Sequence, residues 1–179
     1  MTDKMMACIT NPVKCKLLLE IYAQGQTTAK HLSDVLSDIP QATLYRNLKK
    51  MLNDNILKVV EETQIRGTVE RTYALAFDLN RDLETILAEN SGTLYMQMFM
   101  QYLLGFAKQF REYCKSPNIN IKKDMSGFSL SHLYLSDEEL TELMESISNI
   151  VKMVEKNEPK AGRKLRTLGI IITPPEKIE

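Results

Sequence analysis

Basic and hydrogen-bonding side chains gather in one short segment of the chain, residues 40–53. This segment contains no acidic residue. The side chains in it that could face a ligand are Gln41, Thr43, Tyr45, Arg46, Lys49 and Lys50. Lysine and arginine attract phosphates whatever the base sequence, and an arginine guanidinium can also donate to guanine O6 and N7. This combination favours the recognition of a nucleic-acid duplex.

A helix from Pro40 to about Asn53 would hold these side chains on one face. Apolar residues recur in the segment at helical spacing, and we expect them to face the protein core. These inward residues are Leu44, Leu48, Met51 and Leu52. The polar side chains then lie on the opposite face, where a helix can enter a major groove.

Position along this helix divides the expected contacts. Gln41 and Thr43 lie in the first turn, where a recognition helix meets base edges, and Arg46 lies one turn further on. The remaining outward side chains are suited to phosphates, which set the register of a protein on DNA. They are Tyr45, Lys49 and Lys50.

Two helices are expected before this one. Asn11 followed by Pro12 is typical of a helix start, and Gly25 is typical of a helix end. A second helix is expected from about Thr28, with Thr27 or Thr28 as its cap. Free backbone N–H groups near these two threonines could bind one more phosphate.

Residues 56–62 and 69–75 are expected to form a β-hairpin, because Arg66-Gly67 between them is a turn signal. The order of helix, helix, turn, helix and hairpin is that of a winged helix-turn-helix. At the hairpin tip, Arg66 and Thr68 are expected to touch the DNA backbone or the neighbouring minor groove.

Two less specific explanations stay open for the basic residues. Arg46, Lys49 and Lys50 could form an ordinary solvated helix face, and Arg66 could belong to an ordinary polar turn. The alternative function is a winged-helix protein-interaction module whose basic helix contacts an acidic protein partner. Salt dependence separates that alternative from DNA binding, since binding through several phosphates weakens steeply as salt rises.

The expected domain organisation has three parts. Residues 1–76 form the winged helix-turn-helix domain and residues 77–92 form a connector. Residues 93–179 are expected to form an α+β dimerisation or effector domain. Within it, helices are expected at 93–115 and 137–157.

Two further features describe this second half. Ser136 and Glu139 have the spacing of a capping box at the start of the second helix. Three segments have strand-like patterns: 119–123, 128–135 and 166–173. The first two are expected to pair as a hairpin.

The helix expected at 93–115 has apolar residues on more than one face, which exceeds what packing on one side requires. We expect part of it to form a homodimer interface, because a dimer reads two half-sites about one helical turn apart. The candidate residues for dimer or effector contact are Tyr95, Met98, Phe99, Tyr102 and Phe106. Met96, Met98 and Met100 alternate along this helix, and they could line a pocket for a small apolar effector or belong to a plain core or dimer seam.

Nothing in the sequence indicates an enzyme. The only two histidines, His31 and His132, lack the spacing of a metal site or of a nucleophile and its base. The glycines are isolated from one another, so no phosphate-binding loop is predicted. We therefore expect no catalytic activity and no cofactor.

Composition and apolar patterning suggest a cytoplasmic protein. Basic and acidic residues balance at 23 each. No apolar stretch approaches the roughly 20 residues that a membrane-spanning helix needs, and no signal peptide is predicted. Cys8, Cys15 and Cys114 are too few for a disulfide scaffold, and we expect them to be reduced thiols.

Several segments resemble a known family. They read IPQATLYRNLKKM, NDNILKVVEE and RGTVERTYAL in the first half, and LYLSDEEL and GRKLRTLGIIITP in the second. The first three resemble the DNA-binding domain of bacterial winged helix-turn-helix transcriptional regulators of the ArsR-like group. The last two resemble, less specifically, the C-terminal part of such regulators.

The resemblance implies a homodimer that binds an operator and controls transcription. It implies DNA contacts at Gln41, Thr43, Tyr45, Arg46 and Lys49. The segment TTAKHLSDVL lacks the cysteine motif of metal-sensing members, so no metal site is expected. The sequence thus predicts a mainly α fold with small β content that binds a palindromic operator.

Overall fold

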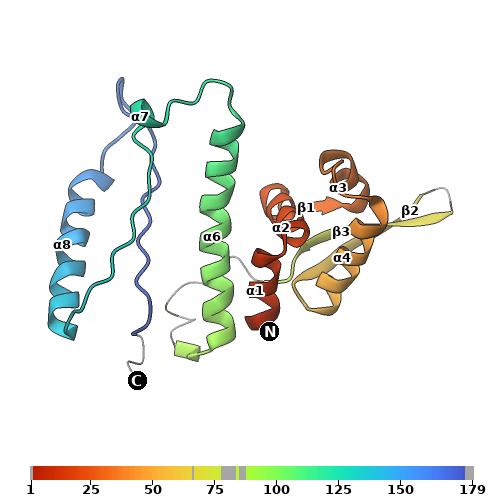
Figure 1. Ribbon diagram of the computed structural model, residues 1–179, viewed down its shortest axis with the longest axis horizontal. Helices are drawn as coiled ribbons and strands as arrows, with labels where there is room; N and C mark the ends of the chain where they lie inside the picture. The colour runs from red at the N-terminus through yellow and green to blue at the C-terminus, as the bar shows by residue number, and fades with distance from the viewer. Residues whose placement is uncertain (1, 66, 78–83, 85–87, 176–179) are drawn as a thin grey trace. The chain divides into compact units, whose positions relative to one another are not determined.

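The computed structural model describes residues 2–65, 67–77, 84 and 88–175. Its elements follow the chain as labelled in Figure 1. They are α1 (Thr2–Thr10), α2 (Pro12–Gln24), β1 (Gln26–Thr28), α3 (Ala29–Val35), α4 (Gln41–Asn53), β2 (Leu57–Ile65), β3 (Thr68–Leu75), α6 (Gly92–Lys115), α7 (Ile121–Asp124) and α8 (Asp137–Glu155). The chain divides into two compact units, Met1–Met125 and Ser126–Glu179.

A three-stranded antiparallel sheet lies in the first unit, with the strand order β1-β3-β2. The β2–β3 hairpin runs from the pair Leu57 and Leu75 to the pair Ile65 and Thr68 at its tip. Gly67, in the turn, has a φ of 85°, a conformation that glycine adopts without steric cost. The short strand β1 was not expected from the sequence. The predicted fold, mainly helical with a small amount of β structure, is confirmed at this level of detail.

Local side-chain bonds start the helices where the sequence indicates. The side chain of Asn11 accepts a hydrogen bond from the Lys14 backbone N–H at 3.0 Å, so it caps α2. Thr28 caps α3 in the same way, through the backbone N–H of His31 at 3.2 Å. Gly25 ends α2 with a φ of 75°.

One apolar core holds the first unit together. It joins α1, α2, α3 and α4 to the sheet, and its fully buried members include Met5, Leu17, Leu18, Ile21, Leu32, Leu44, Leu48, Met51 and Ile56. Helix α6 adds Met100 and Leu104 to this core and packs against α1 and α2. The core therefore fixes the orientation of α4, which carries the predicted ligand-facing residues.

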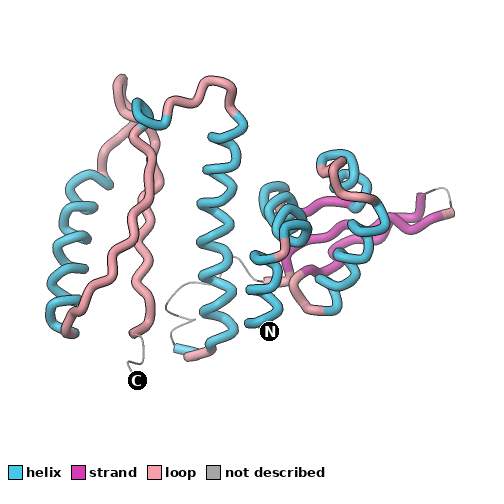
Figure 2. The backbone as a smooth tube through the Cα atoms, in the orientation of Figure 1, coloured by secondary structure: helices cyan, strands magenta, loops and turns pink. Residues whose placement is uncertain are grey.

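The second unit consists of α8 and two long irregular segments (Figure 2). The predicted capping box is confirmed, because the Ser136 side chain accepts from the Glu139 N–H at 3.2 Å. In return, the Glu139 side chain accepts from the Ser136 N–H at 2.8 Å. None of residues 126–175 is buried.

The predicted strands of the second half are wrong. Residues 119–123 and 128–135 form no hairpin, and residues 166–173 form no strand, since the described residues of this half contain no strand. Residues 121–124 are instead the helical turn α7. Asn120 caps this turn by accepting from the Lys123 N–H at 3.0 Å. Alternating apolar residues require a neighbouring strand for their backbone bonds, and the pattern alone does not supply one.

Candidate nucleic-acid interface

Helix α4 separates its side chains into two faces. Leu44, Leu48 and Met51 are buried in the core. The side chains that are exposed on the other face are Gln41, Ala42, Tyr45, Arg46, Lys49, Lys50 and Asn53. The helix begins directly after Pro40, so its polar first turn starts where the sequence predicts. Five of the six predicted contact residues on α4 are thus exposed, and the sixth, Thr43, is half-buried.

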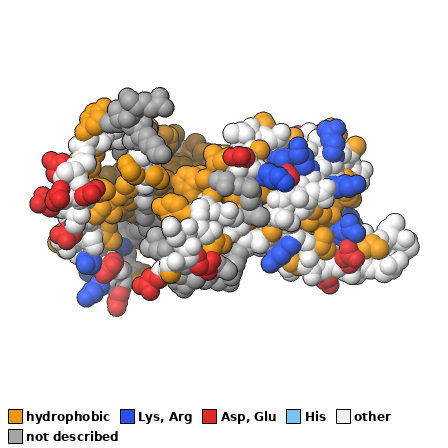
Figure 3. Space-filling view, turned by 90° about the horizontal axis from the view of Figure 1, so that it is seen from below, with side chains coloured by type: hydrophobic (Ala, Val, Ile, Leu, Met, Phe, Trp, Pro, Cys, Tyr) orange, Lys and Arg blue, Asp and Glu red, His pale blue; other side chains and the backbone are white. Residues whose placement is uncertain are grey.

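The cations of α4 carry no internal counter-charge. Within the described ranges no ion pair involves Arg46, Lys49 or Lys50. Asp54, just beyond the helix, is the nearest acidic residue along the chain, and it is engaged by Lys4 at 3.1 Å. These three charges therefore face solvent unneutralised, as a surface for a polyanion requires. Figure 3 shows Lys and Arg side chains on the viewed face of the first unit, in the right-hand part of the view.

The predicted contacts outside α4 have mixed placements. Thr27 is only 7% exposed and lies in β1, where it pairs with Tyr73 of β3. Thr28 and Thr68 line one shallow depression between α3 and the β2–β3 hairpin. The Thr68 hydroxyl donates to the Ile65 carbonyl at 2.9 Å, which closes the hairpin tip. Arg66 lies outside the described residues.

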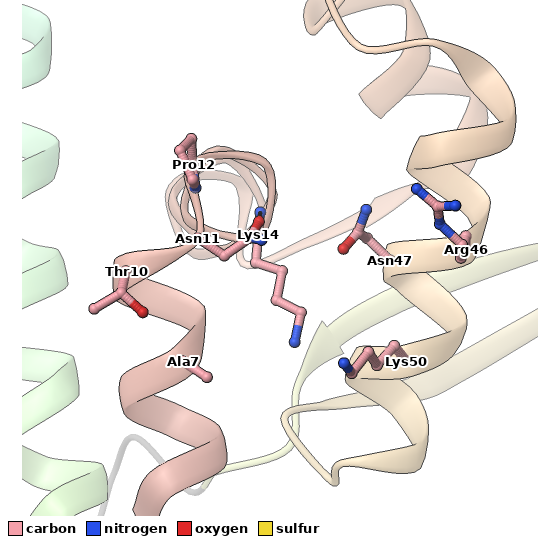
Figure 4. A pocket seen from close by; sticks show the side chains of 8 residues that line it. All are labelled: Ala7, Thr10, Asn11, Pro12, Lys14, Arg46, Asn47 and Lys50. Atoms are coloured by element: carbon pink, nitrogen blue, oxygen red, sulfur yellow. Dashed lines mark hydrogen bonds between the residues drawn. The ribbon is translucent and has the colours of Figure 1, made fainter.

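A second concavity joins α4 to α1 and α2. Its lining is made of Ala7, Thr10, Asn11, Pro12, Lys14, Arg46, Asn47 and Lys50, and we call it the α1–α2–α4 pocket. Figure 4 shows the Lys14 side chain reaching from α2 toward α4, while Asn47 and Lys50 point back from α4. Sequence reasoning missed Lys14 and Asn47, because the pocket forms only where α2 packs against α4.

The predicted dimer residues share one side of α6. At 3.6 residues per turn, Tyr95, Met98, Phe99, Tyr102 and Phe106 fall on the side opposite Met100 and Leu104, which enter the core. Tyr95 is 47% exposed, and the other four are half-buried. The rings of Tyr102 and Phe106 pack with centroids 5.1 Å apart. Met96 packs against the core, and Met100 is buried in it, so two of the alternating methionines serve packing.

The thiols and other ligating groups form no cluster. Cys8 is buried, Cys15 is half-buried and Cys114 is exposed. Burial raises the pKa of both the Cys8 and Cys15 thiols, which keeps them protonated at neutral pH. Among the residues that the structure describes, no group of three or more His, Cys, Asp or Glu side chains could hold a metal ion.

Comparison with known proteins adds no relative. No protein-family model matches the chain, and no curated protein matches its sequence. In the described part of the chain, no helix has both the length and the apolar character needed to cross a bilayer.

Proposed function

We propose that this chain is a sequence-specific DNA-binding transcriptional regulator that acts as a homodimer on a palindromic operator. The observation that carries the proposal is the exposed face of α4, where three cations and three neutral hydrogen-bonding side chains lie on a helix that contains no acidic residue. The element order from α2 to β3 supports it, because a helix, strand, two helices and a hairpin is the order of winged helix-turn-helix domains. The resemblance to ArsR-like regulators points the same way.

In the proposed complex, α4 lies in the major groove. Gln41 and Arg46 contact base edges, with the Arg46 fork suited to guanine O6 and N7. Tyr45, Lys49 and Lys50 contact phosphates and fix the register. Thr68 lies at the tip of the hairpin, and this tip contacts the DNA backbone beside the groove.

We propose a dimer because one copy of α4 can read only a short stretch of DNA. A single helix in a groove reads only a short site, and a two-fold dimer reads two half-sites about 34 Å apart. The apolar side of α6 formed by Tyr95, Met98, Phe99, Tyr102 and Phe106 is the proposed contact between the copies. Burying aromatic and methionine side chains in such a contact is favourable.

Selection of bound duplexes from a random pool tests this function. We expect the full chain to enrich a palindromic motif, and its affinity to fall steeply with salt. With two lysine–phosphate contacts per protomer, Lys49 and Lys50, the slope of log K against log salt is about −4 for a dimer. A pool that stays random, together with salt-insensitive binding, would contradict the proposal. Capture of an acidic protein with no enriched duplex would favour the interaction-module alternative.

A further inference from the structure

The α1–α2–α4 pocket is concave, polar and positively charged. It has a volume of about 530 Å³. Three of its eight lining residues are cations, Lys14, Arg46 and Lys50, and none is acidic. Both helices that face each other across it contribute charge, since Lys14 comes from α2 and the other two come from α4.

Lys14 is unusual among the lysines of the described chain, because it is only 5% exposed. Its Nζ atom forms a long ion pair with Oδ2 of Asp54 at 3.9 Å, which is beyond hydrogen-bond distance. Asp54 makes its closer contact, at 3.1 Å, with Lys4. A buried ammonium whose ion pair is this long and shared is only partly compensated, and a further anion would add to that compensation.

No residue that lines the pocket carries a negative charge. The Cys8 thiol lies near Lys14 and Lys50, but burial raises its pKa, so it stays neutral. The two asparagines offer donors instead. The Oδ1 atom of Asn11 accepts the Lys14 backbone N–H, so its Nδ2 hydrogens are available to a ligand. Asn47 donates one Nδ2 hydrogen to the Thr43 carbonyl at 2.8 Å and keeps the other.

We propose that the α1–α2–α4 pocket binds an anion of the phosphate class, held by Lys14, Arg46 and Lys50. Asn11 and Asn47 donate the neutral hydrogen bonds to its oxygens. Tetrahedral oxyanions match this set, because they accept bonds from several directions and carry enough charge to offset several cations. The same chemistry has two sources: a free phosphorylated molecule, or a phosphate of the DNA backbone.

The pocket and the proposed DNA surface share two side chains, Arg46 and Lys50. A free anion in the pocket draws both away from DNA, so binding of the two ligands is antagonistic. This regulatory step rests on the proposed function, whereas binding of the anion itself does not.

Titration of the full chain with inorganic phosphate, without DNA and at constant ionic strength, tests the site. The matched variants are Lys50→Gln, which removes a pocket charge, and Lys49→Gln, which removes the neighbouring exposed charge outside the pocket. We expect thermal stabilisation of the parent by phosphate and an affinity about tenfold weaker in Lys50→Gln. Lys49→Gln is expected to bind phosphate as the parent does. Equal weakening in both variants would overturn the proposal, because it would indicate unspecific surface charge.

A second arm separates the two sources. Lys14→Gln, checked for its folding by circular dichroism, is compared with the parent in duplex binding. If the parent binds duplex but not phosphate, and Lys14→Gln weakens the duplex more than about threefold, the anion is a backbone phosphate. If the parent binds neither phosphate nor duplex better than Lys14→Gln does, the proposal is wrong. If the parent binds phosphate but no duplex, the anion site is supported and the proposed DNA-binding function is contradicted.

Discussion

Arg111 of α6 donates from Nη1 to Oε2 of Glu20 in α2 at 3.1 Å. Glu20 is only 4% exposed, and its other oxygen accepts from Gln24 Nε2 at 3.0 Å. Beside this pair, Lys108 donates from Nζ to the Ala23 carbonyl at 3.2 Å. These polar bonds flank the apolar contact of α6 with the core, so they fix the rotation of α6 about its own axis.

Substitution of Arg111 by alanine is expected to destabilise the first unit by about 2 kcal/mol, because it leaves a buried carboxylate short of a charged partner. Urea unfolding followed by circular dichroism measures the loss. Arg71→Ala is the control, since Arg71 and Glu62 form a pair in which both side chains are about half exposed. That pair should contribute less than about 1 kcal/mol. Equal losses in the two variants would contradict a structural role for Arg111.

Glu20 also predicts a pH dependence of stability. Burial alone raises its pKa, but hydrogen bonds from Gln24 and Arg111 and the charge of Arg111 outweigh burial and leave the pKa below its usual 4.5. A lowered folded-state pKa stabilises the fold above pH 4.5, and this stability is lost as the pH falls through the lower folded value. We expect the difference in Tm between the parent and Glu20→Gln to shrink below pH 4.5. A difference that stays constant from pH 6 to pH 3 would refute this role.

Arg46 and Lys50 should differ in what they contribute to DNA binding. Arg46→Ala is expected to reduce the preference for the operator over random duplex, with a loss of about 1–3 kcal/mol on the operator. Lys50→Ala is expected to weaken all duplexes similarly and to reduce the salt slope by about one per protomer. Fluorescence anisotropy at several salt concentrations measures both. Operator binding as tight as the parent's in both variants would show that α4 does not enter the groove.

The two units should differ in their ability to fold when they are separated from each other. Every residue of the buried core lies between Met5 and Leu104, and none of residues 126–175 is buried. A fragment of residues 1–125 is expected to unfold cooperatively, whereas residues 126–179 alone bury too little apolar surface to do so. Calorimetry of each fragment measures the transition. A cooperative transition in the isolated C-terminal fragment would mean that its exposed apolar side chains pack in a way that the structure lacks.

Elements that depend on local bonds were predictable from the sequence. The start of α2 follows from Asn11, and that of α8 from the capping box of Ser136 and Glu139, because each cap bonds to a backbone group three residues away. The exposed face of α4 was predictable for a similar reason, since the spacing of its leucines fixes which side chains point outward.

Elements that depend on distant partners were not predictable. Strand β1 has three residues and exists through its pairing with β3, which lies far along the chain. The expected strand at 166–173 fails for the converse reason: its apolar pattern is present, but no strand in the described part of the chain pairs with it. The α1–α2–α4 pocket was missed because Lys14 of α2 and Arg46 of α4 line one pocket only when α2 packs against α4.

The apolar side of α6 leads to a prediction about the oligomeric state. Tyr95 and Phe99 are one helical turn apart, opposite the residues that enter the core, so replacing them should spare the first unit. We expect the parent to sediment as a dimer and the double variant Tyr95→Glu/Phe99→Glu to sediment as a monomer, since two buried carboxylates per copy oppose association. Tyr134→Glu is the control, because Tyr134 is 93% exposed and lies in the second unit. The monomer should also lose its preference for palindromic over half-site DNA, and a double variant that stays dimeric would place the interface elsewhere.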